Sequence, residues 1–114
     1  MNISDLAALQ GFSCLQPDYE DAALSSGYTS DLLSDVMAHA QEGAVLVTIQ
    51  AHKNTVAVAT LCGISAIVFC NNRPVGDDVL EAANKEGIAV FRTAATQFQT
   101  SASIAQHLGK CPAR

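Results

Sequence analysis

Four glycines divide most of this chain into segments of similar length. They stand at positions 43, 63, 87 and 109, so consecutive glycines are 20, 24 and 22 residues apart. Each follows a helical pattern of apolar residues, at the place where helices often end in a left-handed residue. An interval of this length accommodates one short strand and one helix of two or three turns. The chain is therefore predicted to repeat a strand–helix unit.

Three short apolar runs are the predicted strands of this repeat. They occupy residues 44–49, 65–70 and 88–91. None alternates between apolar and polar residues, which is typical of strands covered on both faces. Upstream, residues 11–16 are predicted to form a further strand and residues 4–10 a short helix.

Helices are predicted around these strands, at residues 29–43, 55–62, 77–86 and 97–108. Thr29 or Ser30 is expected to cap the first helix. Asn54 or a neighbour is expected to cap the second helix, and Thr96 the last. Successive strand–helix units favour a parallel sheet with right-handed crossovers. We therefore expect an α/β fold, a single three-layer domain with a mainly parallel sheet, in which the N-terminal helices cover one face.

The proportion of charged residues is low. It is 15%, against about 25% for an average domain, while 49% of the residues are hydrophobic. The chain has 114 residues, enough for one domain with a self-supporting core. A monomer of this composition would leave an apolar patch exposed, and such patches usually mark interfaces. We therefore predict a homodimer.

Charge and hydropathy exclude several classes of partner. The net charge is −5 and there is no run of Lys or Arg, so no nucleic acid is expected to bind. The longest strongly apolar stretch, residues 55–70, is interrupted by Gly63 and is too short to span a bilayer. Residues 1–10 lack the positive charge of a signal peptide. The protein is therefore expected to be cytoplasmic, with no membrane contact.

The four cysteines stand at positions 14, 62, 70 and 111 and form no C-x-x-C pair. Cys62 and Cys70 fall in a predicted helix and a predicted strand, where a free thiol behaves as a small hydrophobic group. The spacing matches neither a zinc site nor a disulfide framework. We expect buried or incidental thiols, no bound metal and no cofactor.

Polar residues follow each of the three repeated strands. In an open parallel sheet, ligands bind beyond the carboxyl ends of the strands, so the three loops should converge on one rim. A helix N-terminus adds partial positive charge there. The rim is the candidate site for a small anion or a nucleotide, with these ligand-binding residues: Thr48, Gln50, His52, Lys53, Asn54, Asn71, Asn72, Arg73 and Thr93, with Arg92 beside the last. The alternative is that they form ordinary strand-to-helix turns and caps.

No catalytic residue is predicted. His52 would need a nucleophile or a reacting water and an acid to orient it, and no nearby motif supplies them. A phosphotransferase would need a G-x-x-x-x-G-K-[ST] loop, whereas the Gly109-Lys110 pair lacks both the first glycine and the final hydroxyl residue. His39 and His107 lie late in predicted helices, where a cation complements the helix dipole.

Residues 30–36 read S-D-L-L-S-D-V and place four polar side chains on one helical stripe. They are Ser30, Asp31, Ser34 and Asp35. Such a stripe is usually a solvated face. Because serine and aspartate are poor helix formers, the alternative is that the stripe lines a subunit contact or a pocket.

Residues 44–108 resemble the DRTGG domain family in their order of apolar strand, polar turn, alanine-rich helix, second strand and a third strand followed by T-x-x-T. Short stand-alone members, which contain S-D-L-L-S-D-V and T-I-Q-x-H-x-N, are closer still. Those motifs are residues 30–36 and 48–54 here. The resemblance implies a single DRTGG-like domain over residues 1–114, with its core at roughly 27–109. It also implies a fold similar to the N-terminal domain of HPr serine kinase/phosphorylase.

Two turns differ from the family pattern. Classical members carry a G-D-R-type turn where this chain has residues 50–54, and T-G-G where it has Cys70-Asn71-Asn72. A glycine turn lets the backbone approach a phosphate closely. This sequence has no glycine at either place.

The resemblance implies a regulatory role, because DRTGG domains occur as regulatory insertions in pyrophosphatases and phosphate acetyltransferases. The stand-alone members are often encoded near iron-only hydrogenase genes. We predict a non-enzymatic regulatory module that binds a small anion or nucleotide and acts through a homodimer or a protein partner in redox metabolism. The alternative is a structural assembly or interaction protein of a redox complex that binds no ligand. An enzyme is the least favoured reading.

Overall fold

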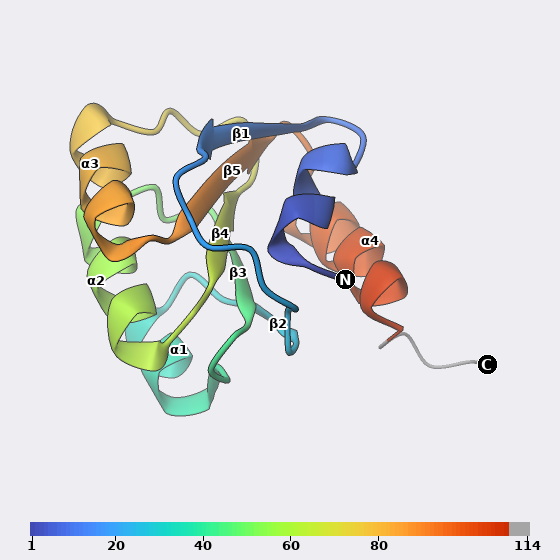
Figure 1. Cartoon of the computed structure of the whole chain (residues 1–114), viewed down its shortest axis with the longest axis horizontal. Coiled ribbons are helices and arrows are strands. Elements are labelled where there is room, and N and C mark those ends of the chain that lie inside the picture. The colour runs from blue at the N-terminus through green and yellow to red at the C-terminus, as the bar shows by residue number, and fades with distance from the viewer. Residues whose placement is uncertain (110–114) are drawn as a thin grey trace.

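Five strands form one sheet in the order β1-β5-β4-β3-β2 (Figure 1). The computed structural model describes residues 1–109 of the chain. The strands are β1 (Phe12–Gln16), β2 (Gly27–Thr29), β3 (Val45–Thr48), β4 (Ala66–Phe69) and β5 (Ala89–Thr93). Neighbours run parallel except at β1, which pairs antiparallel with β5. The predicted α/β fold with a mainly parallel sheet is confirmed.

Helices cover both faces of this sheet and complete three layers (Figure 1). One face carries α1 (Leu33–His39), α2 (Lys53–Cys62) and α3 (Asp77–Glu86). The other carries the short 3₁₀ helix η1 (Ile3–Ala8) and α4 (Gln97–Leu108). The N-terminal helix therefore shares its face of the sheet with the last helix of the chain.

The central strands are buried on both sides, which divides the apolar core into two halves. Val47, Val68 and Phe91 stand in register on adjacent strands and pack toward α4 and η1. Phe69 packs in the other half, with the helices α1 to α3. Both phenylalanines are fully buried, so truncating either to alanine should cost about 3–5 kcal/mol.

The predicted first helix, residues 29–43, is too long at both ends. Thr29 is not a cap, because it belongs to β2, whose residues pair in parallel with β3. The helix α1 begins only at Leu33 and ends at His39. Gly43 has a positive φ of 80°, but it lies in the turn into β3 rather than at the helix end. The sheet bond from Ser30 N–H to the Val47 carbonyl, 3.2 Å, holds the chain extended where a helix was expected.

The other helix ends follow the predicted signals closely. Thr96 caps α4, accepting from the Gln99 backbone N–H at 3.2 Å while the Gln99 side chain accepts from the Thr96 N–H. Gly63 and Gly87 end α2 and α3 with φ of 70° and 66°, a conformation that costs glycine little. The cap of α2, expected at Asn54 or a neighbour, is His52, whose side chain accepts from the Asn54 N–H.

The three described cysteines are free thiols in different surroundings. Cys14 is exposed, Cys62 is half-buried and Cys70 is buried, while Cys111 lies outside the described residues. Burial raises the pKa of the Cys70 thiol, and the sulfur lies 3.5 Å from the Thr100 hydroxyl oxygen. Across residues 1–109, no group of three or more His, Cys, Asp or Glu side chains could hold a metal ion. None of the helices in that range has the length and hydropathy needed to cross a membrane.

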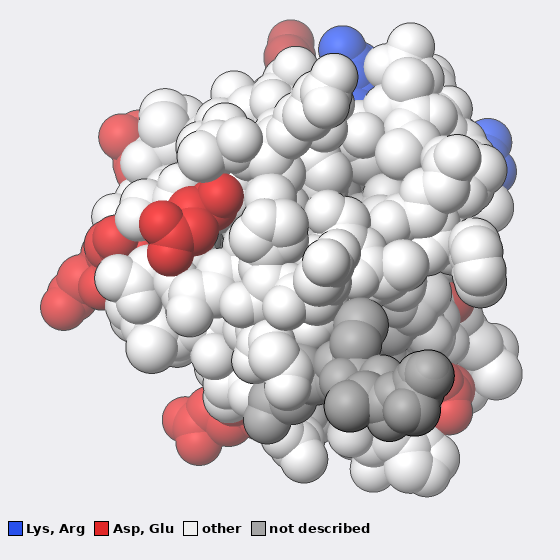
Figure 2. Space-filling view, turned by 90° about the vertical axis from the view of Figure 1, so that its right-hand side faces the viewer, with Lys and Arg blue, Asp and Glu red and all other residues white. Residues whose placement is uncertain are grey.

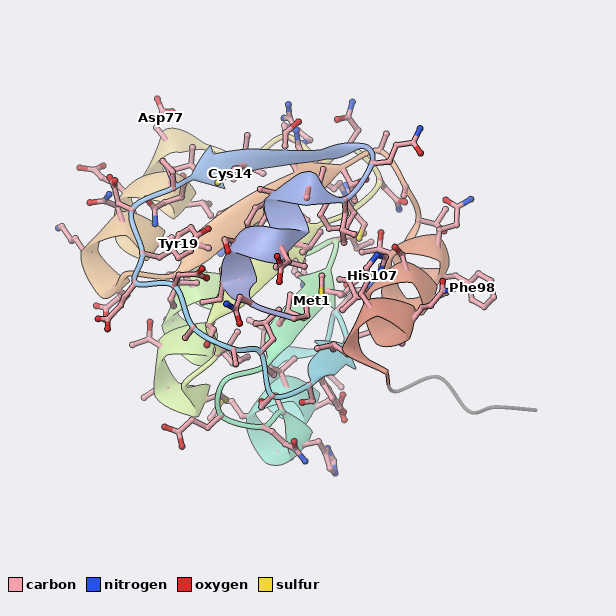
Figure 3. The ribbon with its side chains drawn as sticks, turned by 45° about the vertical axis from the view of Figure 1, so that its right-hand side comes forward. Met1, Cys14, Tyr19, Asp77, Phe98 and His107 are labelled. Carbon is pink, nitrogen blue, oxygen red and sulfur yellow. The ribbon has the colours of Figure 1, made fainter. Side chains whose placement is uncertain are left out.

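The surface has one broad face that is poor in charge. Figure 2 shows the side that carries α4, with acidic side chains mainly toward its margins, basic side chains toward its upper right, and uncharged atoms across much of the rest. Phe98 projects from α4 into solvent (Figure 3) and is 84% exposed. The other large exposed apolar side chains, Leu32, Met37 and Leu61, belong to or adjoin α1 and α2.

Candidate functional site

The carboxyl ends of β3 and β4 open onto a small cavity. Its volume is about 220 Å³ and it is lined by Ile49, Gln50, Ala51, His52, Arg73 and Pro74. The segments after two of the three repeated strands therefore meet, as the parallel arrangement requires. Gln50, His52 and Arg73 are all exposed here. Each offers N–H groups, so the cavity wall is rich in hydrogen-bond donors.

His52 stands at the start of α2 and has one ring nitrogen already engaged. Its Nδ1 accepts a hydrogen bond from the Asn54 backbone N–H at 3.1 Å. In the neutral ring the proton must then sit on Nε2, which is left as a donor. Because α2 begins at the next residue, the N-terminus of the helix dipole contributes partial positive charge beside the His52 ring.

Local hydrogen bonds hold the turn from Thr48 to Thr55 in one shape. The Thr55 hydroxyl donates to the Gln50 carbonyl at 2.7 Å, and the His52 N–H donates to the same carbonyl at 2.8 Å. The Gln50 N–H donates to the Thr48 hydroxyl at 3.1 Å. These hydrogen bonds therefore fix the backbone that carries Gln50 and His52.

Asp31 ties this turn to two other parts of the chain. Its Oδ1 atom accepts hydrogen bonds from the Thr48 hydroxyl at 2.8 Å, the Ile49 N–H at 2.9 Å and the Gln97 side-chain amide at 3.0 Å. One carboxylate thus joins the segment before α1, the end of β3 and the start of α4. Thr48 is buried beneath the turn, so it supports the rim and does not line the cavity.

The predicted polar stripe of residues 30–36 does not form as one helical face. Ser30 and Asp31 precede α1, while Ser34 and Asp35 belong to it. Asp35 faces β2, where it accepts from the Tyr28 hydroxyl at 2.7 Å and pairs with His39 at 3.1 Å. The two aspartates therefore serve different contacts.

The β4–α3 and β5–α4 loops are joined through their backbones. Asn71 N–H donates to the Ala95 carbonyl at 3.0 Å, and Asn72 N–H donates to the Thr93 carbonyl at 2.9 Å. Thr93 is buried, and its hydroxyl accepts from the Ala95 N–H at 3.2 Å. Both asparagine side chains are exposed beside the cavity loop, but they do not line the cavity itself.

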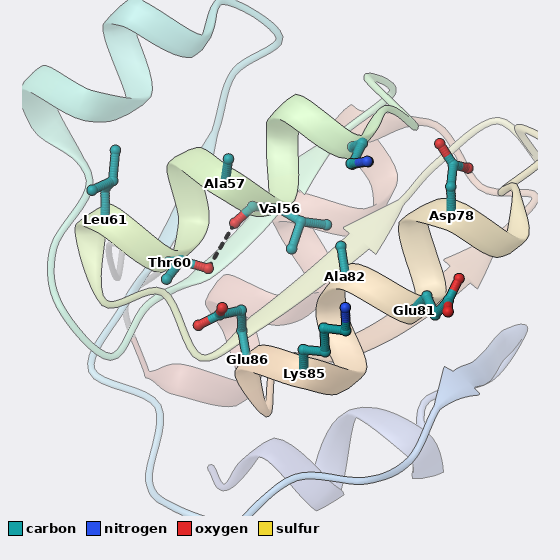
Figure 4. Close-up of a pocket in the computed structure, with 10 residues that line it drawn as sticks. Val56, Ala57, Thr60, Leu61, Asp78, Glu81, Ala82, Lys85 and Glu86 are labelled. Atoms are coloured by element: carbon teal, nitrogen blue, oxygen red, sulfur yellow. Dashed lines mark hydrogen bonds between the residues drawn. The ribbon is translucent and has the colours of Figure 1, made fainter.

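Lys53 and Asn54 do not line the cavity beside His52. Lys53 lines a different and larger cavity between α2 and α3, of about 560 Å³ (Figure 4). Its floor is apolar, with Val56, Ala57 and Ala82, and acidic side chains of α3 stand along one side. Asn54 is exposed on the first turn of α2. Of the predicted site residues, the structure gathers only Gln50, His52 and Arg73 around one cavity.

Residues 24–107 match the family model described as the DRTGG domain. The chain belongs to the DRTGG domain family. No curated protein matches the chain.

One solved structure with a similar fold is the crystal structure of the CBS and DRTGG domains of the regulatory region of Clostridium perfringens pyrophosphatase, complexed with its activator, diadenosine tetraphosphate. The TM-score is 0.72 at 13% sequence identity, and the match covers 91% of this chain. It covers 46% of the pyrophosphatase chain, so this DRTGG domain spans about half the length of that region. At this identity the likeness shows the fold alone.

The turn after β4 in this DRTGG domain keeps a backbone that glycine would favour. Asn71 and Asn72, which stand where the family pattern has a glycine pair, have φ of 59° and 51°. Asparagine tolerates this left-handed region better than most residues. The loop therefore makes a left-handed turn with two asparagines, whose amide side chains are exposed.

Proposed function

We propose that this DRTGG domain is a non-enzymatic regulatory module that binds a small anion, or the phosphate end of a nucleotide, in the cavity beside His52. The observation that carries the proposal is the meeting of Gln50, His52 and Arg73 around one cavity. All three side chains can donate hydrogen bonds, and no carboxylate lines the cavity.

Arg73 gives this cavity its charge. Within residues 1–109, one ion pair forms, between His39 and Asp35. Arg73 therefore has no acidic partner among these residues. An unpaired guanidinium beside a helix N-terminus favours an anion, and its planar fork suits phosphate oxygens. The similar fold in the pyrophosphatase belongs to a regulatory region that was crystallised with a dinucleotide activator, which supports a phosphate-bearing ligand.

The size of the cavity limits what it can enclose. Pockets that hold a whole small molecule are about 300–1,000 Å³, whereas this one is about 220 Å³. It would therefore hold a phosphate-sized group, and the remainder of a nucleotide would lie outside it, near the exposed Asn71 and Asn72 side chains.

The same geometry speaks against catalysis by His52. A general base in a hydrolytic triad is oriented by a carboxylate that accepts from Nδ1. Here Nδ1 is itself an acceptor for the Asn54 N–H, so the ring is held by the helix that it caps. This arrangement supports a binding role.

Thermal unfolding with and without phosphate compounds tests the proposal. Phosphate, AMP and ATP are each added to the wild type, to Arg73→Ala and to Lys85→Ala, whose lysine lies on α3. A ligand that binds only the folded state stabilises it by about 2.7 kcal/mol at one hundred times its Kd. The Tm of the wild type and of Lys85→Ala should rise with at least one compound, and that of Arg73→Ala should not. Equal responses of the two variants would contradict the proposal.

The second candidate is an interaction protein that binds no ligand. It is favoured by the exposure of large apolar side chains, which ranges from 55% for Met37 to 84% for Phe98. Such side chains are common at protein interfaces. We further propose that the module acts as a homodimer, in either case. A flat response to every phosphate compound, together with self-association, would select this second candidate.

A further inference from the structure

The strand β2 forms one edge of the sheet, and within residues 1–109 no backbone hydrogen bond is made to the outward-facing groups of Gly27 and Thr29. The Ser26 carbonyl accepts from the Val45 N–H at 3.0 Å, and the Ser30 N–H donates to the Val47 carbonyl at 3.2 Å. Alternate residues of a strand direct their backbone groups to opposite sides. Ser26, Tyr28 and Ser30 therefore face β3, while the N–H and C=O groups of Gly27 and Thr29 face away from the sheet. Open edges of this kind are sites of pairing with another strand.

A groove without charge runs along this edge. It has a volume of about 390 Å³ and lies between β2 and α4. Its lining residues are Ser26, Gly27, Thr29, Gln41, Val47, Ser101, Ile104, Ala105 and Leu108. By contrast, the groove between α2 and α3 includes five charged side chains among its lining residues.

The exposed aromatic ring of α4 extends the same surface. Ser101, Ala105 and Leu108 line the groove, and Phe98 precedes Ser101 by three residues, which places it on the same helical face. The Thr29 hydroxyl and the Ser101 hydroxyl lie 2.6 Å apart, which fixes α4 against β2. The edge of β2, the groove and Phe98 thus form one continuous surface, which we name the β2–α4 face.

We propose that the β2–α4 face binds the same face of a second copy of this chain, and that the two β2 strands pair antiparallel across a twofold axis. The inference concerns the homodimer of the proposed function and is independent of its ligand. In this arrangement the axis passes beside Tyr28, and Gly27 of each copy exchanges both of its outward hydrogen bonds with Thr29 of the other. Two identical strands can satisfy this pattern because the outward residues lie symmetrically about Tyr28.

The absence of charge from the groove favours a second copy over a strongly charged partner. Two copies that each carry a net charge of −5 repel one another, so they can approach closely only where charge is absent. The residues that line the groove are all uncharged and meet that condition, and uncharged atoms cover much of the side that carries α4 (Figure 2). A strongly basic or acidic partner would find no complementary charge in the groove.

The test combines mass measurement with two matched pairs of variants. Analytical ultracentrifugation compares Thr29→Lys with Thr60→Lys, an exposed threonine of α2, and Phe98→Ser with Leu61→Ser, an exposed leucine of α2. The wild type should sediment as a dimer of the 11.9 kDa chain. Thr29→Lys and Phe98→Ser should weaken dimerisation at least tenfold, and the two α2 variants should dimerise as the wild type does. Circular dichroism melts confirm that each variant is folded.

Amide hydrogen exchange gives a signature that a general loss of structure would not produce. The Gly27 and Thr29 amides should exchange rapidly in dilute protein and become protected as the concentration rises, whereas Tyr28 should be protected throughout. Protection of Gly27 and Thr29 that does not depend on concentration would assign the edge to a segment of the same chain and overturn the proposal. A monomeric wild type, or a dimer that Thr29→Lys and Phe98→Ser leave intact, would also overturn it.

Dimerisation and phosphate binding can be lost separately, because they involve different parts of the surface. Monomeric Thr29→Lys should keep the response to phosphate, because the cavity beside Arg73 lies at the carboxyl ends of β3 and β4. The Arg73→Ala variant should remain dimeric and should lose the response to phosphate. A dimer with no phosphate response would refute only the ligand site.

Discussion

The Nδ1 atom of His52 accepts a hydrogen bond from the backbone N–H of Asn54 at 3.1 Å. One imidazole thereby caps α2 and presents Nε2–H beside the cavity that Arg73 also lines. Binding and stability therefore depend on the same side chain, and they can be separated only by a substitution that keeps the cap.

His52→Ala should destabilise the protein by about 0.5–2 kcal/mol, the usual cost of losing a side-chain cap. His52→Asn should restore most of that free energy of unfolding, because asparagine is a good cap. Both variants should respond more weakly to phosphate, since neither has an imidazole N–H. Urea unfolding of the two variants measures their stability, and phosphate titration measures their binding. A His52→Asn variant that binds phosphate as the wild type does would remove His52 from the site.

Asp31→Ala should lower the free energy of unfolding by about 1–3 kcal/mol, because it leaves the Ile49 N–H and the Thr48 hydroxyl without their acceptor. Asp31→Asn should cost less, since its amide oxygen can still accept. Ser34→Ala, on the exposed side of α1, is the control and should be nearly neutral. An Asp31→Ala variant as stable as the control would show that the carboxylate does not hold the rim together.

Stability should fall in acid partly through Asp35. The hydrogen bond from the Tyr28 hydroxyl, with a further one from Ser30, lowers the pKa of Asp35. A lowered pKa means that the folded state binds fewer protons than the unfolded state. The stabilisation is therefore present above the unfolded pKa and is lost as the pH falls through the folded pKa.

Tyr28→Phe tests this linkage, because it removes the donor and leaves the ring. The variant should be less stable than the wild type at neutral pH, and the difference should shrink as the pH falls below the usual range of an aspartate. Chemical unfolding at a series of pH values provides the comparison. A difference that stays constant from neutral to acid pH would mean that the Tyr28–Asp35 bond does not set the pKa of Asp35.

Cys70 should resist alkylation in the folded protein. It is buried, and that burial raises the pKa of its thiol, so little reactive thiolate forms. Of the three cysteines within residues 1–109, Cys14 is the exposed one and should react first. Mass spectrometry after brief iodoacetamide treatment, with and without urea, would show the order. Equal labelling of Cys70 and Cys14 in the native protein would contradict the described core.

The parts of the fold that local sequence determines were predicted well. The helix α3 carries Asp77 and Asp78 in its first turn, Lys85 in its last, and Gly87 at its end, and each of these signals acts within one turn. Thr96 and Gln99 likewise cap α4 through residues three apart. Such signals do not depend on where the rest of the chain lies.

The parts that depend on distant contacts were missed. The strand β2 has only three residues, Gly27–Thr29, with no apolar run, and it exists because β3 lies beside it. Asp31 looked like part of a polar helical stripe, whereas its partners Thr48 and Gln97 are 17 and 66 residues away. Neither contact has a local signature. The sequence could therefore indicate which loops carry the candidate site, but not which side chains share its cavity.

The most direct test of the central claim is an NMR titration of the ¹⁵N-labelled protein with phosphate or ATP. If the cavity binds phosphate, saturable shifts should appear at the backbone amides of residues 49–53 and at Arg73, and Arg73→Ala should abolish them while Lys85→Ala preserves them. Saturable shifts confined to the α2–α3 groove, or no shifts at any concentration, would contradict it.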